Sequence, residues 1–171
     1  LVAGGAGFIG SFLVKELIRY GASVTVLIRP ASSAWRIRNV KKRLRTIAAD
    51  LNRQSVVKKL IAAQKPQMIF NLAAVVKKEQ NLNILEEQIN DNFLTTFHLL
   101  EAARKTGVKK FIQIGSTLEY GNARSPFYEE KKTFPNSPHA LSKTLATDLV
   151  LYYHQTSSLQ TCVARPTATF G

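Results

Sequence analysis

Short runs of β-branched and other apolar residues alternate along the chain with longer segments whose apolar positions recur every three or four residues. The short runs predict strands near residues 1–3, 23–28, 45–48, 67–72, 109–115 and 160–165. The longer segments predict helices near 8–20, 53–64, 83–106 and 140–156, with a further short helix around 34–43. This alternation is typical of an α/β fold with a doubly wound parallel sheet. We expect one domain, covering residues 1–171.

A glycine-rich turn joins the first predicted strand to the first predicted helix, with the sequence Gly4-Gly5-Ala6-Gly7-Phe8-Ile9-Gly10. Gly4 permits a tight turn, Gly7 lets phosphates approach the backbone, and Gly10 lets the helix pack close to the strand. The first N–H groups of that helix, at Phe8 and Ile9, then face an anion and the helix dipole favours it. This context predicts binding of a dinucleotide through its pyrophosphate.

Other notable segments also follow predicted strands. They are Arg29, Asp50, Asn71–Ala74, Gly115–Gly121 and Arg165–Gly171. Ligands of parallel α/β sheets bind beyond the carboxyl ends of the strands, where the strand order reverses. We therefore expect these segments to meet at one edge of the sheet, with the Pro-, Ser- and Asn-rich segment 122–138 forming a loop over the site.

The residue at the end of the second predicted strand bears on the choice of coenzyme. An acid there would hydrogen-bond the adenosine ribose and repel a 2′-phosphate. The chain has Arg29 instead, and a guanidinium pairs with phosphate while the hydroxyls of Ser32 and Ser33 add donors. This favours NADP, with NAD as the alternative. Arg29 would otherwise simply belong to a solvated basic face.

The net charge of +13 is high, and no acid lies between Glu16 and Asp50. A basic face of this kind fits a phosphorylated ligand or a solvated surface. A nucleic-acid partner is not favoured, because aromatic residues are sparse among these bases, with Tyr20 and Trp35 alone, and no nucleic-acid motif is present.

Cysteine and hydropathy suggest the setting of the protein. Cys162 lies in an apolar strand pattern and is expected to be a buried thiol, and a single cysteine cannot form an internal disulfide. No apolar run approaches the ~20 residues of a membrane span. A reducing, cytoplasmic setting fits these features. We expect no metal, because no cluster has the spacing of metal ligands.

Taken in order, the motifs resemble those of the extended short-chain dehydrogenases/reductases, NAD(P)-dependent epimerases, dehydratases and reductases that act on nucleotide sugars. Ala3–Gly10 is similar to the TGxxGxxG element, Asn71–Ala74 to HLAA, Ile114–Gly121 to SSSxxVYG, and Arg165–Gly171 to RPxxxYG. Asp50 matches an Asp beside the adenine, and Asn92 matches an Asn that supports the active-site backbone.

The resemblance implies a Rossmann-like domain whose coenzyme contacts are Gly4, Gly7, Phe8, Ile9, Gly10, Arg29, Asp50, Leu51, Leu72, Ala73, Ala74, Lys143 and Pro166. It also implies pairing of two subunits through the helices at 83–106 and 140–156. The family continues beyond the last motif into a smaller substrate domain. This domain is expected to be largely missing from a chain that stops at Gly171.

The resemblance also implies catalytic roles. In the family, a Tyr and a Lys in a YxxxK motif share one face of a helix, and the Lys binds the nicotinamide ribose and lowers the pKa of the phenol. Here the motif contains His139 and Lys143, so the phenol is replaced by an imidazole. Ser116 is expected to hold the reacting hydroxyl. Its alternative role is a local hydrogen bond at a strand end.

His139 leaves three interpretations open. A neutral imidazole next to an ammonium could act as the base at pH 7, although its nitrogen ends short of the phenol oxygen. The enzyme could instead be weakened or inactive, or the protein could be an NADP-binding sensor or partner protein without turnover.

The residues after Ser116 narrow the reaction. Family dehydratases have an Asp-Glu pair there, whereas this chain has Thr117 and Leu118, which argues against 4,6-dehydration. Hydride transfer at sugar C4 remains, either as epimerisation through a keto sugar or as reduction of a 4-keto sugar.

Overall fold

The strands form one parallel sheet. The computed structural model describes residues 1–30, 32–77 and 81–169. Its strands are β1 (Val2–Ala3), β2 (Val24–Ile28), β3 (Leu44–Ala48), β4 (Met68–Asn71), β5 (Lys110–Ile114) and β6 (Gln160–Ala164). They pair in the order β3-β2-β1-β4-β5-β6, with every pairing parallel. The predicted doubly wound parallel sheet is confirmed.

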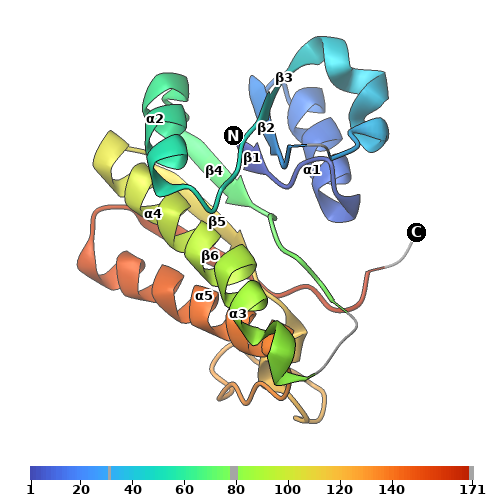
Figure 1. The fold of residues 1–171 in the computed structure, drawn as a ribbon, viewed down its shortest axis with the longest axis vertical. Coiled ribbons are helices and arrows are strands. Elements are labelled where there is room, and N and C mark those ends of the chain that lie inside the picture. Colours follow the sequence, from blue (N-terminus) through green and yellow to red (C-terminus); the bar gives the residue numbers. More distant parts are fainter. Residues whose placement is uncertain (31, 78–80, 170–171) are drawn as a thin grey trace.

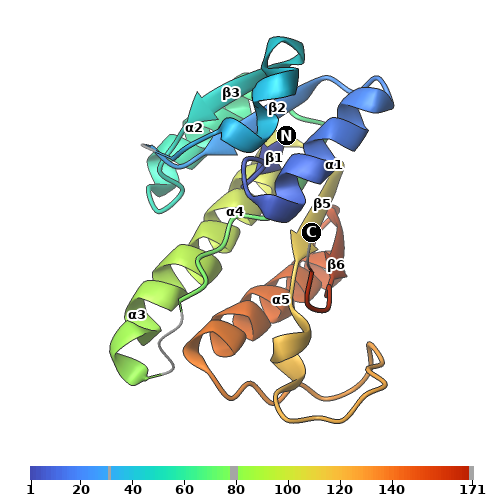
Figure 2. The ribbon, with the colours of Figure 1, turned by 90° about the vertical axis from the view of Figure 1, so that its right-hand side faces the viewer.

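Helices cover the two faces of this sheet (Figures 1 and 2). On one face, α1 (Phe8–Arg19) and the 3₁₀ helix η1 (Trp35–Arg43) enclose a core that includes Val14, Ile18 and Ile37. On the other face, α2 (Gln54–Gln64), α4 (Thr95–Thr106) and α5 (Pro138–Thr156) enclose a core that includes Ile61 and Leu99. The apolar periodicity predicted these helices because apolar residues at every third or fourth position form the face that each helix buries.

The predicted helix over 83–106 differs from the structure. The segment contains a 3₁₀ turn η2 (Leu82–Ile84), α3 (Leu85–Gln88), a π-helical turn η3 (Ile89–Leu94) and then α4. The hydroxyls of Thr95 and Thr96, the first two residues of α4, donate to the carbonyls of Asp91 and Asn92 in the π turn, at 2.7 Å each. A π turn shifts the helical register by one residue, and such turns frequently occur at functional sites. Apolar spacing does not reveal a local shift of this kind.

The strand order reverses between β1 and β4, and the turns that follow these two strands touch. Gly4 has φ of +75°, and a Cβ at this position would lie 2.7 Å from backbone atoms of Leu72 and Ala73. Beyond β1 the chain leads to β2 on one side, whereas beyond β4 it leads to β5 on the other. This divergence opens a crevice at the carboxyl ends of the strands.

The prediction that Cys162 is buried is wrong, because its side chain is exposed. It lies on β6, the edge strand of the sheet. An apolar pattern identifies a strand, but it does not tell whether another layer covers each face of that strand.

Residues 122–137 of the predicted loop 122–138 contain neither helix nor strand, whereas Pro138 already begins α5. Phe170 and Gly171, which end the last motif, lie outside the described residues. Over the described part of the chain, no helix combines the length and apolar character that crossing a bilayer requires.

Candidate functional site

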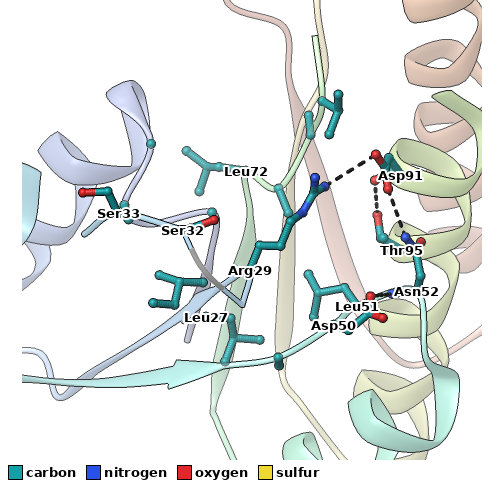
Figure 3. Close-up of a pocket in the computed structure, with 18 residues that line it drawn as sticks. Leu27, Arg29, Ser32, Ser33, Asp50, Leu51, Asn52, Leu72, Asp91 and Thr95 are labelled. Atoms are coloured by element: carbon teal, nitrogen blue, oxygen red, sulfur yellow. Dashed lines mark hydrogen bonds and ion pairs between the residues drawn. The ribbon is translucent and has the colours of Figure 1, made fainter. Parts of the chain in front are cut away.

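A cavity of about 420 Å³ lies at the carboxyl ends of β1, β2 and β4 (Figure 3). It is lined by Gly4, Ala6, Gly7, Leu27, Ile28, Arg29, Ser32, Ser33, Ala49, Asp50, Leu51, Asn52, Leu72, Ala73, Ala74, Val75, Asp91 and Thr95. The lining therefore comes from the end of β2, from the segments after β1, β2, β3 and β4, from the π turn and from the start of α4. Residues far apart in the sequence meet here because parallel strands end at the same edge of the sheet.

The N-terminus of α1 lies at this cavity. Gly7 is its N-cap, with no side-chain cap recorded in the described structure and no acid in the first turn of α1. A Cβ at Gly10 would lie 2.3 Å from the Gly4 carbonyl oxygen, so only glycine permits this approach of helix to turn. Gly4 and Gly7 line the cavity, while Phe8, Ile9 and Gly10 form the first turn of α1 beside it. An uncapped helix N-terminus of this kind attracts an anion.

Arg29 extends from the end of β2 toward the π turn (Figure 3). Its guanidinium Nη2 lies 3.5 Å from Asp91 Oδ2, and the Arg29 side chain is 60% exposed. The other oxygen of Asp91 accepts a hydrogen bond from Asn52 Nδ2 at 2.9 Å. Ser32 and Ser33 line the same cavity. Asp91 was not among the predicted site residues, and it competes with any ligand phosphate for Arg29.

The segment after β3 is held by local hydrogen bonds. Asp50 Oδ1 accepts a hydrogen bond from the Asn52 N–H at 3.0 Å, and Asp50 Oδ2 lies 3.7 Å from Arg53 Nε. The Leu51 carbonyl accepts a hydrogen bond from His98 Nδ1 on α4 at 2.9 Å. These contacts fix Asp50 and Leu51 at the rim of the cavity.

The segment after β4 is fixed by a buried amide. Asn71 Nδ2 donates to Thr96 Oγ1 at 3.1 Å and to Gln113 Oε1 at 2.9 Å. Its Oδ1 accepts a hydrogen bond from the Ala73 N–H at 3.2 Å. The carbonyl end of the Asn71 side chain thereby sets the path of residues 72–74 along the cavity wall. A buried, fully paired amide of this kind makes the wall rigid.

Ser116 and Pro166 lie beyond β5 and β6. Ser116 is the N-cap of the 3₁₀ turn η4 (Thr117–Tyr120), and its Oγ accepts a hydrogen bond from the Leu118 N–H at 3.2 Å. The local hydrogen bond considered for Ser116 is thus present. The Pro166 carbonyl accepts hydrogen bonds from Thr117. Neither Ser116 nor Pro166 lines the cavity described above.

Lys143 is 4% exposed, and its ammonium donates to the Ile114 carbonyl at the end of β5. Burial lowers the pKa of Lys143 to about 8, against the opposing effect of the Glu119 carboxylate. The lysine is therefore charged at neutral pH and close to its titration range.

His139 stands one helical turn before Lys143 on α5, as the spacing predicted. Its Nδ1 lies 3.2 Å from the Val75 carbonyl and 3.2 Å from Gln88 Oε1. Burial and the nearby Lys143 ammonium lower the pKa of His139 below its usual value, although the Val75 carbonyl opposes this shift. The imidazole is consequently neutral at pH 7.

The geometry thus contains two neighbouring parts, a cavity at the strand ends and a titratable pair on α5. Val75 connects them, because it lines the cavity and also binds His139. Within the described ranges, no three His, Cys, Asp or Glu side chains are grouped to hold a metal ion.

The sequence also matches a known family. The model of the NAD dependent epimerase/dehydratase family matches residues 1–171. The chain belongs to this family. The match confirms the resemblance inferred from the glycine turn and the motifs at the strand ends.

Relatives of this epimerase/dehydratase family member are about twice as long. A dTDP-glucose 4,6-dehydratase of Streptomyces niveus is 30% identical over 183 residues, which cover 100% of this chain and 54% of that protein. The NAD complex of the Thermus thermophilus UDP-glucose 4-epimerase aligns with a TM-score of 0.82 at 29% identity, over 96% of this chain and 53% of that one. Pal from Bacillus thuringiensis aligns with a TM-score of 0.92 at 27% identity, over 99% and 56%. The chain spans about half the length of these relatives.

The buried ion pair between Glu119 and Arg165 was not predicted as part of the site. Glu119 is fully buried and its Oε2 accepts a hydrogen bond from Arg165 Nε at 2.7 Å, while its Oε1 binds the Ser116 N–H at 2.7 Å and Thr147 Oγ1 at 3.2 Å. Arg165 also donates to the Tyr120 hydroxyl at 3.0 Å. The signal was available, because Glu119 and Arg165 both stand in strand-end motifs and buried charges require partners.

Proposed function

We propose that this protein binds a nicotinamide dinucleotide in the cavity at the strand ends and acts as a nucleotide-sugar oxidoreductase or epimerase by hydride transfer at sugar C4. The observation that carries the proposal is the uncapped N-terminus of α1, which opens into a cavity at the point where the strand order reverses. Such a site suits a pyrophosphate between two nucleosides.

The residues present fit this group. The pyrophosphate would lie against the Gly4–Gly10 turn, where a side chain at Gly10 would collide with the Gly4 carbonyl. The adenosine would extend toward Asp50 and Leu51, and Leu72, Ala73 and Ala74 would form the opposite wall. Lys143 and Pro166 would serve the nicotinamide end.

Arg29, Ser32 and Ser33 support NADP, since they add a cation and hydroxyl donors to the cavity rim. The ion pair between Arg29 and Asp91 disfavours NADP, because Asp91 competes with a 2′-phosphate for the guanidinium. NAD, the coenzyme named for the Thermus relative, is the alternative.

The proposed chemistry divides the work among three side chains. When bound, the nicotinamide supplies the group that takes or returns a hydride at the sugar carbon. Ser116 would hold the C4 oxygen, and His139 would take its proton as a neutral base. Lys143 would orient the nicotinamide ribose with its ammonium.

A 4,6-dehydration is disfavoured on two grounds. Thr117 and Leu118 lack the carboxylates that move the protons of water, and the carboxylate of Glu119 is engaged by Arg165, Thr147 and the Ser116 N–H. The proposal therefore keeps epimerisation or reduction, although several relatives are dehydratases.

A second candidate is a coenzyme-binding sensor or partner protein without turnover. His139 favours it, because an imidazole held by its Nδ1 does not reach as far as a phenol oxygen.

Isotope transfer separates the two candidates. The whole protein is incubated with NADP⁺ or NAD⁺ and with UDP-glucose or dTDP-glucose carrying deuterium at C4, and the quenched mixture is analysed by mass spectrometry of the coenzyme and NMR of the sugar. Hydride transfer predicts deuterium in the reduced coenzyme, or a C4 epimer that retains deuterium at C4, with a faster transfer in a His139→Tyr variant. Coenzyme binding with no deuterium transfer in either protein would refute the proposed reaction and support the sensor.

A further inference from the structure

Two buried amide side chains, those of Gln88 and Asn92, lie one after the other next to His139. Gln88, at the end of α3, is fully buried, and Asn92 in the π turn is 1% exposed. Gln88 Oε1 lies 3.2 Å from His139 Nδ1, whereas Gln88 Nε2 has no hydrogen-bond partner in the described structure. Buried amides are nearly always paired at both ends. The orientation of the Gln88 amide, with its oxygen toward His139, therefore needs an explanation.

The backbone of Val75 fixes the orientation of Asn92. The Val75 N–H can only donate, and it donates to Asn92 Oδ1 at 2.8 Å. Asn92 Nδ2 therefore lies on the other side of the amide, where it donates to the Val75 carbonyl at 3.2 Å. Ser142 agrees with this assignment, since its hydroxyl donates to the His139 carbonyl and its Oγ accepts a hydrogen bond from Asn92 Nδ2 at 2.9 Å.

The orientation of Asn92 fixes that of Gln88. Asn92 Nδ2 lies 3.0 Å from the Gln88 side chain, and a donor requires an acceptor at that position. The atom must be the oxygen, because the swapped orientation would bring two N–H groups together. Gln88 Nε2 is thereby placed at the other end of the amide, where it has no partner among the described residues.

His139 Nδ1 consequently faces two acceptors, the Val75 carbonyl and Gln88 Oε1. A neutral imidazole has one protonated and one unprotonated nitrogen, and only the protonated one can face acceptors. Among the described residues, both hydrogen bonds of the ring involve Nδ1. The other nitrogen, Nε2, then carries the lone pair.

We infer that Gln88 is a positioning residue which, together with the Val75 carbonyl, holds His139 as the Nδ1–H tautomer and presents the Nε2 lone pair to the hydroxyl of a bound ligand. The inference rests on the proposed function for the identity of that hydroxyl. When the sugar O–H bond breaks, its proton would form an Nε2–H bond and its electron pair the C=O bond, while the hydride on that carbon would go to the nicotinamide of the proposed function. The Nδ1–H remains in place throughout.

The tautomer is measurable in the whole protein without any turnover. The chain has three histidines, so ¹⁵N-histidine labelling gives few signals, and His98→Asn and His154→Asn variants assign them. At a pH where the imidazole is neutral, the inference predicts a protonated Nδ1 and an unprotonated Nε2 for His139. The opposite pattern, with Nε2 protonated, overturns the inference even if deuterium transfer is observed.

A Gln88→Met variant tests the role of Gln88 itself, because it keeps the length of the side chain and removes the acceptor. We expect a mixture of tautomers at His139 and a kcat lowered on the order of tenfold with little change in KM. The control is Gln155→Met at an exposed position of α5, which should change neither the tautomer of His139 nor kcat.

If Gln88→Met keeps the Nδ1–H pattern and the kcat of the wild type, Gln88 is not a positioning residue. If the variant does not fold, the tautomer of the wild type decides. A wild type that shows the Nδ1–H pattern but no deuterium transfer supports the inference and refutes the proposed reaction.

Discussion

At the scale of single residues, Lys143 is the side chain whose burial has the clearest energetic consequence. Its ammonium donates to the Ile114 carbonyl, and burial lowers its pKa to about 8. A lysine in the unfolded chain titrates near 10.5. Keeping this charge in the interior is therefore destabilising at neutral pH, and a role in ligand binding gives a reason for its presence.

The folding stability should reveal this cost through its pH dependence. Between pH 8 and 10.5 the unfolded chain binds the Lys143 proton and the folded protein does not, so the stability of the wild type should rise with pH. The rise relative to a Lys143→Met variant should be roughly 3 kcal/mol, measured by urea unfolding across this range. The control Lys58→Met, at an exposed site on α2, should keep the wild-type slope. Equal slopes for wild type and Lys143→Met would show that the lysine is not buried as described.

The same two titratable groups predict a bell-shaped rate profile for the proposed hydride transfer. The rate should rise as His139 loses its proton below the usual histidine pKa, because burial and Lys143 lower its value. It should fall as Lys143 loses its proton near pH 8, with Glu119 opposing that loss. The measurement is kcat/KM from about pH 5 to about pH 9. A profile that is flat across this range would contradict these roles.

At the scale of elements, the close contact between α1 and the turn after β1 positions the candidate site. A Cβ at Gly10 would lie 2.3 Å from Gly4 O and 2.8 Å from Gly5 Cα, and both are backbone atoms that cannot move aside easily. The N-terminus of α1 thus reaches the cavity because two glycines permit it.

A Gly10→Ala variant should therefore lose about 1–3 kcal/mol of unfolding free energy and most of its coenzyme affinity. Gly21→Ala at the other end of α1 is the control. No heavy atom of the described residues lies within 4 Å of its added Cβ, but its φ of +78° makes alanine cost about 1–2 kcal/mol. The control should lower the stability and leave coenzyme affinity unchanged, as measured by thermal unfolding and NADPH fluorescence. Equal affinity in the two variants would argue against a role of this turn in binding.

The sequence predicted elements well where periodicity reports burial, and less well where other contacts decide. The strands and α1, α2 and α5 follow from apolar spacing. The π turn at Ile89–Leu94 does not, because it depends on threonine hydroxyls and on the contact of Asn92 with Val75. Gln88 carried no signal in the sequence, since its contact with His139 spans 51 positions and joins two elements. The burial of Cys162 was predicted wrongly, because whether another layer packs on the edge strand β6 depends on the tertiary structure.

At the scale of the whole molecule, the parallel strand order gathers residues from β2 and from the π turn around one cavity. Arg29 and Asp91 are separated by 62 positions in the numbering, yet they form an ion pair beside the cavity. Partly exposed pairs of this kind contribute little to stability. The pair should instead influence how strongly the cavity binds a negatively charged ligand group.

Removing the charge of Asp91 should free Arg29 for a 2′-phosphate. We expect an Asp91→Asn variant to bind NADPH about three- to tenfold more tightly and NADH with little change. Asp148→Asn, which makes the same charge change at an exposed position of α5, should alter neither affinity. Fluorescence titration gives both dissociation constants. An equal gain for both coenzymes would indicate that Arg29 does not contact the 2′-phosphate.

Every role proposed above requires that the cavity between β1 and β4 binds a nicotinamide dinucleotide, and calorimetric titration of the folded chain with NADPH and NADH measures this binding. We expect heat of binding with a stoichiometry of about one coenzyme per chain, a higher affinity for NADPH than for NADH, and loss of this heat in Gly10→Ala. A folded wild-type protein that gives no heat with either coenzyme at several temperatures would contradict this expectation.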